Sequence, residues 1–178
     1  MNIGDEIEIF TAKISGFEEK RDYVSLSNII KPVDEMVNDY LNGYTATHEQ
    51  KLKYYKGYQM EKDLLMRMKL VYGERLVTPV EVSYGLLFKG HPDFTLDDFP
   101  GDCKSVNLDD HLPKAKLPAK VYWQINAYLF CTEKEKGLIV YESRESGKIQ
   151  SRWVYPNPSI QEQIAEKIHQ AENKLTHV

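Results

Sequence analysis

The sequence is poor in cysteine, in long apolar runs and in excess positive charge. Its only cysteines, Cys103 and Cys131, are too few for a four-thiolate iron–sulfur cluster or a zinc ribbon, and we expect two free thiols. The apolar runs at 85–88 and 122–130 fall short of the roughly 18 residues of a membrane span, so we expect no membrane contact. Residues 1–8 are acidic and lack the features of a secretory signal, which predicts a cytoplasmic protein.

The net charge of −4 argues against a protein that coats nucleic acid through overall basicity. It does not exclude an enzyme, because a carboxylate-lined metal site adds negative charge that bound cations offset. Apolar residues make up 42% and charged residues 28% of the chain, which is typical of a folded globular protein. The length of 178 residues predicts a single domain over 1–178.

Hydrophobic periodicity predicts alternating helices and strands along the chain. We expect helices over 25–41, 53–72, 121–132 and 157–175, strands over 77–84, 85–94, 102–106, 138–142 and 149–155, a turn over 95–100 and an exposed loop over 107–118. The order favours an α/β fold in which helices cover a central sheet.

Glu61 falls on the apolar stripe of the helix expected over 53–72. Burying an unpaired carboxylate costs several kcal/mol, so Glu61 must reach water, meet a cation or bind a metal ion. The stripe alone leaves these alternatives open.

Asp102 and Lys104 stand two residues apart on an expected strand, so their side chains share one face while Cys103 points to the other. The pair is either an ion pair on an exposed strand or part of a cleft. Asp93 follows Pro92, which interrupts a strand, and is either a turn residue or a carboxylate aimed away from the strand ladder.

Gln124 and Tyr128 lie one helical turn apart on the inward stripe of the helix expected over 121–132. They can present an amide and a phenol to one site, or Tyr128 can simply pack in the core. We expect Tyr122 and Trp123 to pack or lie on the surface rather than to stack on bases. Three lysines in or beside the 107–118 loop are either DNA-backbone contacts or solvated side chains: Lys114, Lys116 and Lys120.

These residues together resemble the PD-(D/E)xK nuclease superfamily, especially its RecB-like exonuclease branch. In that family a helix carries the first acid, a strand carries the second after a glycine, the next strand carries Asp-x-Lys, and a following helix carries Gln-x-x-x-Tyr. The matching segments here, in the same order, are Glu61, Gly90-His91-Pro92-Asp93, Asp102-Cys103-Lys104 and Gln124 to Tyr128. The resemblance implies a restriction-endonuclease-like core, a central mixed β-sheet flanked by helices in αβββαβ order.

The resemblance covers residues 25–155, and Ser25-Leu26-Ser27 is similar to the serine-rich start of the RecB-like branch. Two departures leave the subfamily open. Many RecB-like relatives carry a histidine where this chain has Glu61, and Gly57-x-x-x-Glu61 is closer to the lambda-exonuclease pattern. The cysteine cluster of the iron–sulfur members is absent, so we expect no iron–sulfur cluster.

The resemblance also implies Mg²⁺, for which Mn²⁺ can substitute, held by Asp93, Asp102, the Cys103 carbonyl and Glu61. Lys104 would orient the attacking water or help to deprotonate it, and Gln124 and Tyr128 would position the strand. The expected activity is an exonuclease acting from DNA ends in recombination, repair or phage DNA processing.

An endonuclease or junction resolvase on the same fold, and a catalytically silent DNA-binding module, stay open as alternatives. A metallohydrolase of small phosphates lacks any histidine-rich or phosphate-loop signature here. DNA is the expected partner, and a homo-oligomer or a recombination partner protein is expected by analogy alone.

Overall fold

The computed structural model describes residues 21–114 and 116–177; the acidic residues 1–8, on which the expectation of a cytoplasmic protein rests, lie outside them. In chain order the elements are β1 (Val24–Ser25), η1 (Leu26–Asn28), α2 (Val33–Asn42), α3 (His48–Tyr72), η2 (Gly73–Arg75), β2 (Leu76–Val77), β3 (Val82–Tyr84), β4 (Phe88–Gly90), β5 (Phe94–Leu96), β6 (Phe99–Val106), η3 (Asp109–His111), α4 (Ala119–Thr132), β7 (Gly137–Ser143), β8 (Ile149–Val154) and α5 (Pro158–Thr176). None of the described helices combines the length and apolar character that a bilayer span requires.

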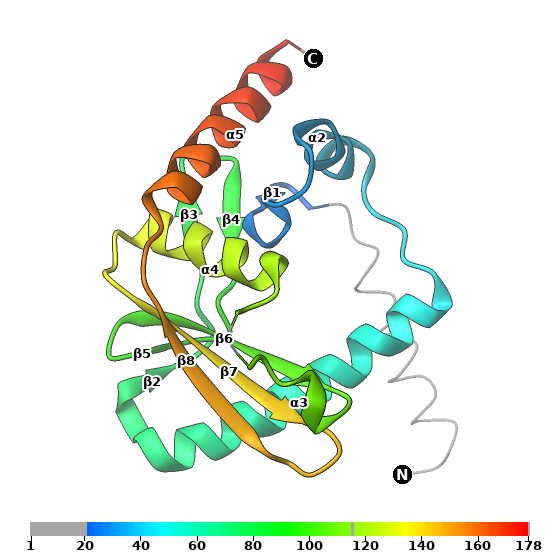
Figure 1. Cartoon of the computed structure of the whole chain (residues 1–178). Coiled ribbons are helices and arrows are strands. Elements are labelled where there is room, and N and C mark those ends of the chain that lie inside the picture. The colour runs from blue at the N-terminus through cyan, green and yellow to red at the C-terminus, as the bar shows by residue number, and fades with distance from the viewer. Residues whose placement is uncertain (1–20, 115, 178) are drawn as a thin grey trace.

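The main sheet has five strands in the order β2-β5-β6-β7-β8. Strands β6 and β7 run parallel and the other neighbours run antiparallel, so the sheet is mixed. Helix α4 connects the two parallel strands, as a parallel pair requires. Figure 1 shows α3 along one face of this sheet and α4 on the other side. The expected α/β architecture, a mixed central sheet flanked by helices, is confirmed.

Strand β7 shows how the sheet joins two apolar clusters. Leu138 and Val140 belong to the cluster beneath α3, whereas Ile139 and Tyr141 belong to the cluster that includes α4 and α5. All residues of β7 are buried, which is the pattern of a central strand covered on both faces.

A smaller sheet, in the order β1-β4-β3, packs close to α4. A Cβ atom on Gly90 of β4 would lie 2.6 Å from the Tyr128 ring, so glycine is required for this approach. The close contact places the end of β4, and the Asp93 segment after it, beside the polar residues of α4.

The first helix is shorter than the periodicity predicts. The expectation of a helix over 25–41 is wrong for its first half, because β1 and η1 occupy Val24–Asn28 and α2 begins only at Val33. Pro32 explains the late start, since a proline restricts the preceding residue to extended conformations and itself suits a helix N-terminus.

The strands between α3 and α4 are shorter and more numerous than predicted. Of the strands expected over 77–84 and 85–94, only β2, β3 and β4 form, and the expected turn over 95–100 is instead a hairpin of β5 and β6. Its turn is confined to Asp97 and Asp98, which adopt φ of 51° and 66°. Tight two-residue hairpin turns require such positive φ, which aspartate tolerates better than most residues.

The predicted bounds of α4, β7, β8 and α5 are confirmed to within two residues at each end.

Helix α3 begins earlier than predicted, at His48, because Thr47 and Gln50 form a reciprocal capping box. The sequence period predicts an apolar stripe on this helix, and the prediction is wrong at both ends of the stripe: Tyr54, Tyr58, Leu64, Leu65, Met68 and Val71. Leu64 is buried, but Tyr54, Tyr58 and Val71 are 43%, 48% and 76% exposed. The C-terminal half of α3 packs on the sheet, whereas its N-terminal part extends beyond the sheet edge (Figure 1).

Candidate active site

A cavity of about 770 Å³ opens beside β6, and β1, α2, α3, β6 and α4 all contribute to its walls. It brings together residues that are far apart in the sequence. Glu61, Asp93, Asp102, Lys104, Gln124 and Tyr128 all line it. Each predicted acid, and the lysine, therefore faces the same space.

Asp102 and Lys104 form the floor of this cavity. The Asp102 side chain is 2% exposed, and the Lys104 ammonium lies against its Oδ2 oxygen, to which no described residue donates a hydrogen bond of regular geometry. Burial alone would lower the pKa of Lys104, but Asp102 and Asp93 outweigh that effect and raise it above its usual value. Lys104 is therefore a cation. Cys103 between them points into the apolar cluster beneath α3, as the strand period predicts.

Asp93 lies in a bend between β4 and β5 rather than on a strand. Its Oδ2 accepts a hydrogen bond of 2.6 Å from the backbone N–H of Cys103. Burial, followed by repulsion from Asp102, raises the pKa of Asp93 to about 8. Because the N–H and C=O of one strand residue point to the same edge, the Cys103 carbonyl also faces the Asp93 side.

Glu61 projects from α3 toward the same acids. Burial raises the pKa of Glu61 above its usual value, and the charge of Asp102 raises it further, whereas Lys104 and Arg144 act in the opposite direction. The Glu61 side chain is partly buried in the cavity wall.

Gln124 connects α4 to the acid floor. Its Nε2 group donates to Asp102 Oδ1 at 3.0 Å and to the Tyr128 hydroxyl at 2.8 Å. The Tyr128 hydroxyl in turn donates to the His91 carbonyl at 3.4 Å. Burial and the charge of Asp102 raise the pKa of Tyr128, so it remains a neutral donor. The amide and phenol thus hold one oxygen of Asp102 in a fixed direction.

The donor set suits a hard divalent cation. Among the described residues, no three carboxylate, imidazole or thiol side chains lie close enough together to enclose an ion. Mg²⁺ does not need such an enclosure, because it commonly keeps several waters and binds through one or two carboxylates. Asp93 and Asp102 provide those oxygens, and the Cys103 carbonyl adds a neutral one. The raised pKa of Asp93 and the buried Oδ2 of Asp102 mark a place where extra positive charge is stabilising.

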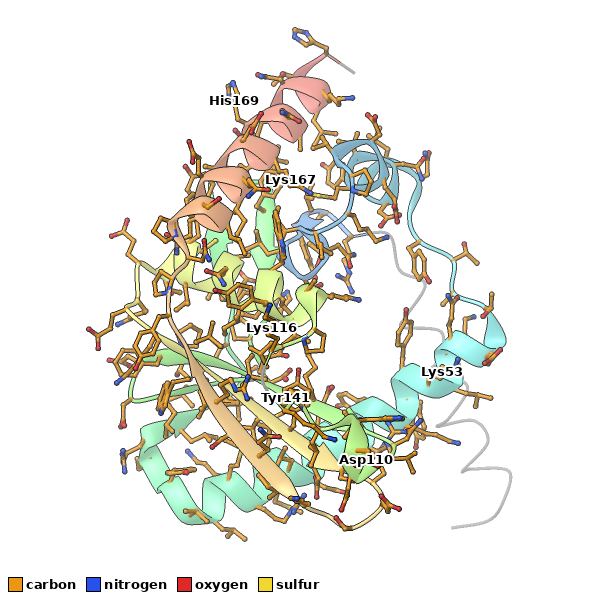
Figure 2. The ribbon with its side chains drawn as sticks, in the orientation of Figure 1. Lys53, Asp110, Lys116, Tyr141, Lys167 and His169 are labelled. Atoms are coloured by element: carbon orange, nitrogen blue, oxygen red, sulfur yellow. The ribbon has the colours of Figure 1, made fainter. Side chains whose placement is uncertain are left out.

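The three predicted loop lysines are placed differently from one another. Lys120, in the first turn of α4, lines the cavity. Lys114 is exposed and forms an ion pair of 3.8 Å with Asp110. Lys116 is exposed in the segment before α4 (Figure 2) and is not among the cavity-lining residues.

Several cavity residues were not predicted from the sequence. Arg144, just after β7, lines the cavity and donates to Ser105 Oγ at 2.9 Å. Tyr44, Tyr54 and Tyr58 line its wall on the side of α3. The aromatic residues at helical spacing around Gly57 are the sequence signal for this wall. The same spacing, however, predicts side chains packed in the core. Arg144 carried no signal, because its place depends on how β7 ends beside β6.

Solved structures of other proteins agree on the fold. No protein-family model matches the chain, and no curated protein matches it in sequence. An alkaline exonuclease from Laribacter hongkongensis superposes with a TM-score of 0.65 at 15% identity over 96% of this chain and 95% of that one. The same enzyme in complex with dAMP gives 0.63 at 13% identity over the same shares. A phage-related exonuclease from Haemophilus somnus 129PT gives 0.59 at 14% identity over 90% and 95%. The chain therefore has the fold of these exonucleases.

Proposed function

We propose that this protein is a metal-dependent DNA nuclease that acts as an exonuclease from DNA ends. The observation that carries the proposal is the acid and lysine floor of the cavity, where buried Asp102 and partly buried Asp93 and Lys104 face one open space together with Glu61. The solved structures of the same fold, an alkaline exonuclease and a phage-related exonuclease, support DNA as the substrate. One of them binds dAMP, a deoxynucleotide.

Asp93, Asp102 and the Cys103 carbonyl would hold a Mg²⁺ ion, for which Mn²⁺ can substitute, and Glu61 would add a further carboxylate. Such an ion supplies Lewis-acid stabilisation of a phosphodiester and a more acidic bound water. The chain's own residues do the positioning. Lys104, held as an ammonium between Asp102 and the cavity, provides a fixed positive charge for a scissile phosphate, and Gln124 orients Asp102.

The proposal is tested with end-labelled linear DNA in Mg²⁺ or Mn²⁺, with EDTA as the blank. We expect the unsubstituted chain to release nucleotides, and Lys104→Ala to lower the rate by about 10²- to 10³-fold, the typical loss for one electrostatic group at a reacting centre. Lys148→Ala, an exposed lysine outside the cavity, is the matched control and should retain the full rate. Nucleotide release that persists in Lys104→Ala contradicts this role of Lys104.

Covalently closed circular DNA separates the two kinds of nuclease. An exonuclease leaves the circle intact and degrades it only after a nick or linearisation. Cleavage of the closed circle would assign an endonuclease instead. If neither DNA is cut, while the unsubstituted chain and Asp102→Ala bind DNA equally, the chain is a binding module.

A further inference from the structure

Two tyrosines of α3 face the cavity instead of the core. Tyr54 and Tyr58 are 43% and 48% exposed and both line the wall. Leaving large aromatic surface half-exposed forgoes part of the stabilisation that burial would give. Lys53, the neighbour of Tyr54, also lines the cavity, on the part of α3 that extends beyond the sheet (Figure 2).

The two rings share a helical face with Glu61. They stand seven and three residues before it, so they lie about 10.5 Å and 4.5 Å along the helix axis from Glu61. All three positions fall within about 60° on the helical wheel. A polymer bound at the acid floor and extending along α3 would meet Tyr58 first and Tyr54 next.

Tyr54 has a neighbour that fixes its position. The Tyr44 hydroxyl is hydrogen bonded to that of Tyr54, and the Lys31 ammonium lies 5.5 Å from the centre of the Tyr44 ring. Tyr44 is thus held by its own contacts and supports Tyr54. Basic side chains from other elements line the same space: Arg21, Lys120 and Arg144.

We propose that Tyr54 and Tyr58 stack on unpaired bases of the DNA strand next to the acid floor, so that the substrate is single-stranded or melted where it is cut. This inference rests on the proposed function for the identity of the ligand as DNA. Aromatic rings beside basic groups are how proteins bind single strands without sequence preference.

The spacing of the two rings favours unpaired bases. Residues one helical turn apart stand about 6 Å apart along the axis, whereas stacked bases repeat every ~3.4 Å, so each ring takes a base from an unstacked strand. The cavity of about 770 Å³ falls in the range of pockets that enclose small ligands, roughly 300–1,000 Å³.

The test compares two eight-unit strands that carry the same phosphates, one with natural bases and one abasic throughout. Binding is followed by fluorescence anisotropy in Mg²⁺ with Asp102→Asn as the background, so that neither strand is cut. We expect Tyr58→Ala and Tyr54→Ala each to weaken binding of the natural strand by roughly 5- to 150-fold and that of the abasic strand less than about 2-fold. Tyr58→Phe, which keeps the ring, should bind as the background does, and so should Leu70→Ala on the exposed face of α3.

Each outcome decides the point. Equal weakening on both strands, or none on the natural strand, overturns base stacking. If the ring dependence holds while the unsubstituted chain releases no nucleotides, the stacking site stands and the nuclease proposal falls. If no strand binds to any variant, both proposals fall.

Discussion

At the scale of single residues, the charge on Asp93 carries an energetic cost. Its folded pKa of about 8 lies above its usual value of 3.8, so between these limits the folded protein holds a proton that the unfolded chain releases. Stability of the metal-free protein should therefore fall as pH rises from about 4 to 8, with a slope of at most ~1.4 kcal/mol per pH unit. Asp93→Asn removes that slope and keeps an oxygen for the Cys103 N–H.

Melting temperatures in EDTA at pH 5 and pH 8.5 measure this effect. We expect Asp93→Asn to melt above the unsubstituted chain, with a wider gap at pH 8.5. Mg²⁺ should narrow the gap by stabilising only the unsubstituted chain. Asp98→Asn, at an exposed turn, is the control. It should change the free energy of unfolding by less than about 0.5 kcal/mol at either pH. A gap that does not change with pH would show that the charge on Asp93 is not the cause.

Some site residues could be predicted from the sequence because their spacing forces the geometry. Asp102 and Lys104 share a strand face whatever else the fold does, and Gln124 and Tyr128 share a helix face. Tyr58 could not be predicted, because an aromatic residue at helical spacing reads as core until it is known where the helix leaves the sheet. The roles of the acids and of Lys104 remain predictions for the assays above.

At the scale of elements, two glycines in the site region should respond oppositely to alanine. A Cβ on Gly90 would lie 2.6 Å from the Tyr128 ring and would push α4 away from β4, whereas a Cβ on Gly57 meets nothing within 4 Å. We expect Gly90→Ala to destabilise the protein by about 1–3 kcal/mol, as overpacking does, and Gly57→Ala to stabilise α3 by roughly 0.5–1 kcal/mol.

Urea unfolding measures both changes. Gly90→Ala should also lower nuclease activity, because Tyr128 and Gln124 move together and Gln124 orients Asp102. Unchanged stability in Gly90→Ala would mean that the α4 contact relaxes without cost. Gly57→Ala serves as the comparison for the effect of a new methyl group alone.

The elements most open to prediction were those with uninterrupted period. Helix α4 and strands β7 and β8 each have one hydrophobic pattern throughout, so the predicted bounds agree with the observed ones to within two residues. The region between α3 and β6 misled the pattern because its strands span only two or three residues each and apolar residues continue into the loops. In strands this short, the pairing partners decide the structure, and the periodicity of one strand does not show which partner it takes.

At the scale of the whole molecule, α5 fastens the chain segment that leads into α2. Lys167 Nζ donates to the carbonyls of Ile29, Ile30 and Lys31 at 3.1, 3.1 and 2.7 Å, across at least 136 residues of sequence. It also lies 5.1 Å from the centre of the Trp123 ring. Figure 2 shows Lys167 on α5, on the side that faces α2. Because Lys31 and neighbouring residues line the cavity, this contact determines where one wall stands.

Lys167→Met keeps the apolar stem of the side chain but removes the ammonium, leaving three partly buried carbonyls without their donor. We expect a loss of about 1–3 kcal/mol in the free energy of unfolding. We also expect a several-fold rise in KM for DNA with little change in kcat, because the cavity wall moves while the acid floor, Asp102 and Lys104 of β6 with Asp93 before β5, stays in place. Lys148→Met, on the exposed turn before β8, is the matched control and should change neither. A fall in kcat at constant KM would mean instead that α5 supports the acid floor directly.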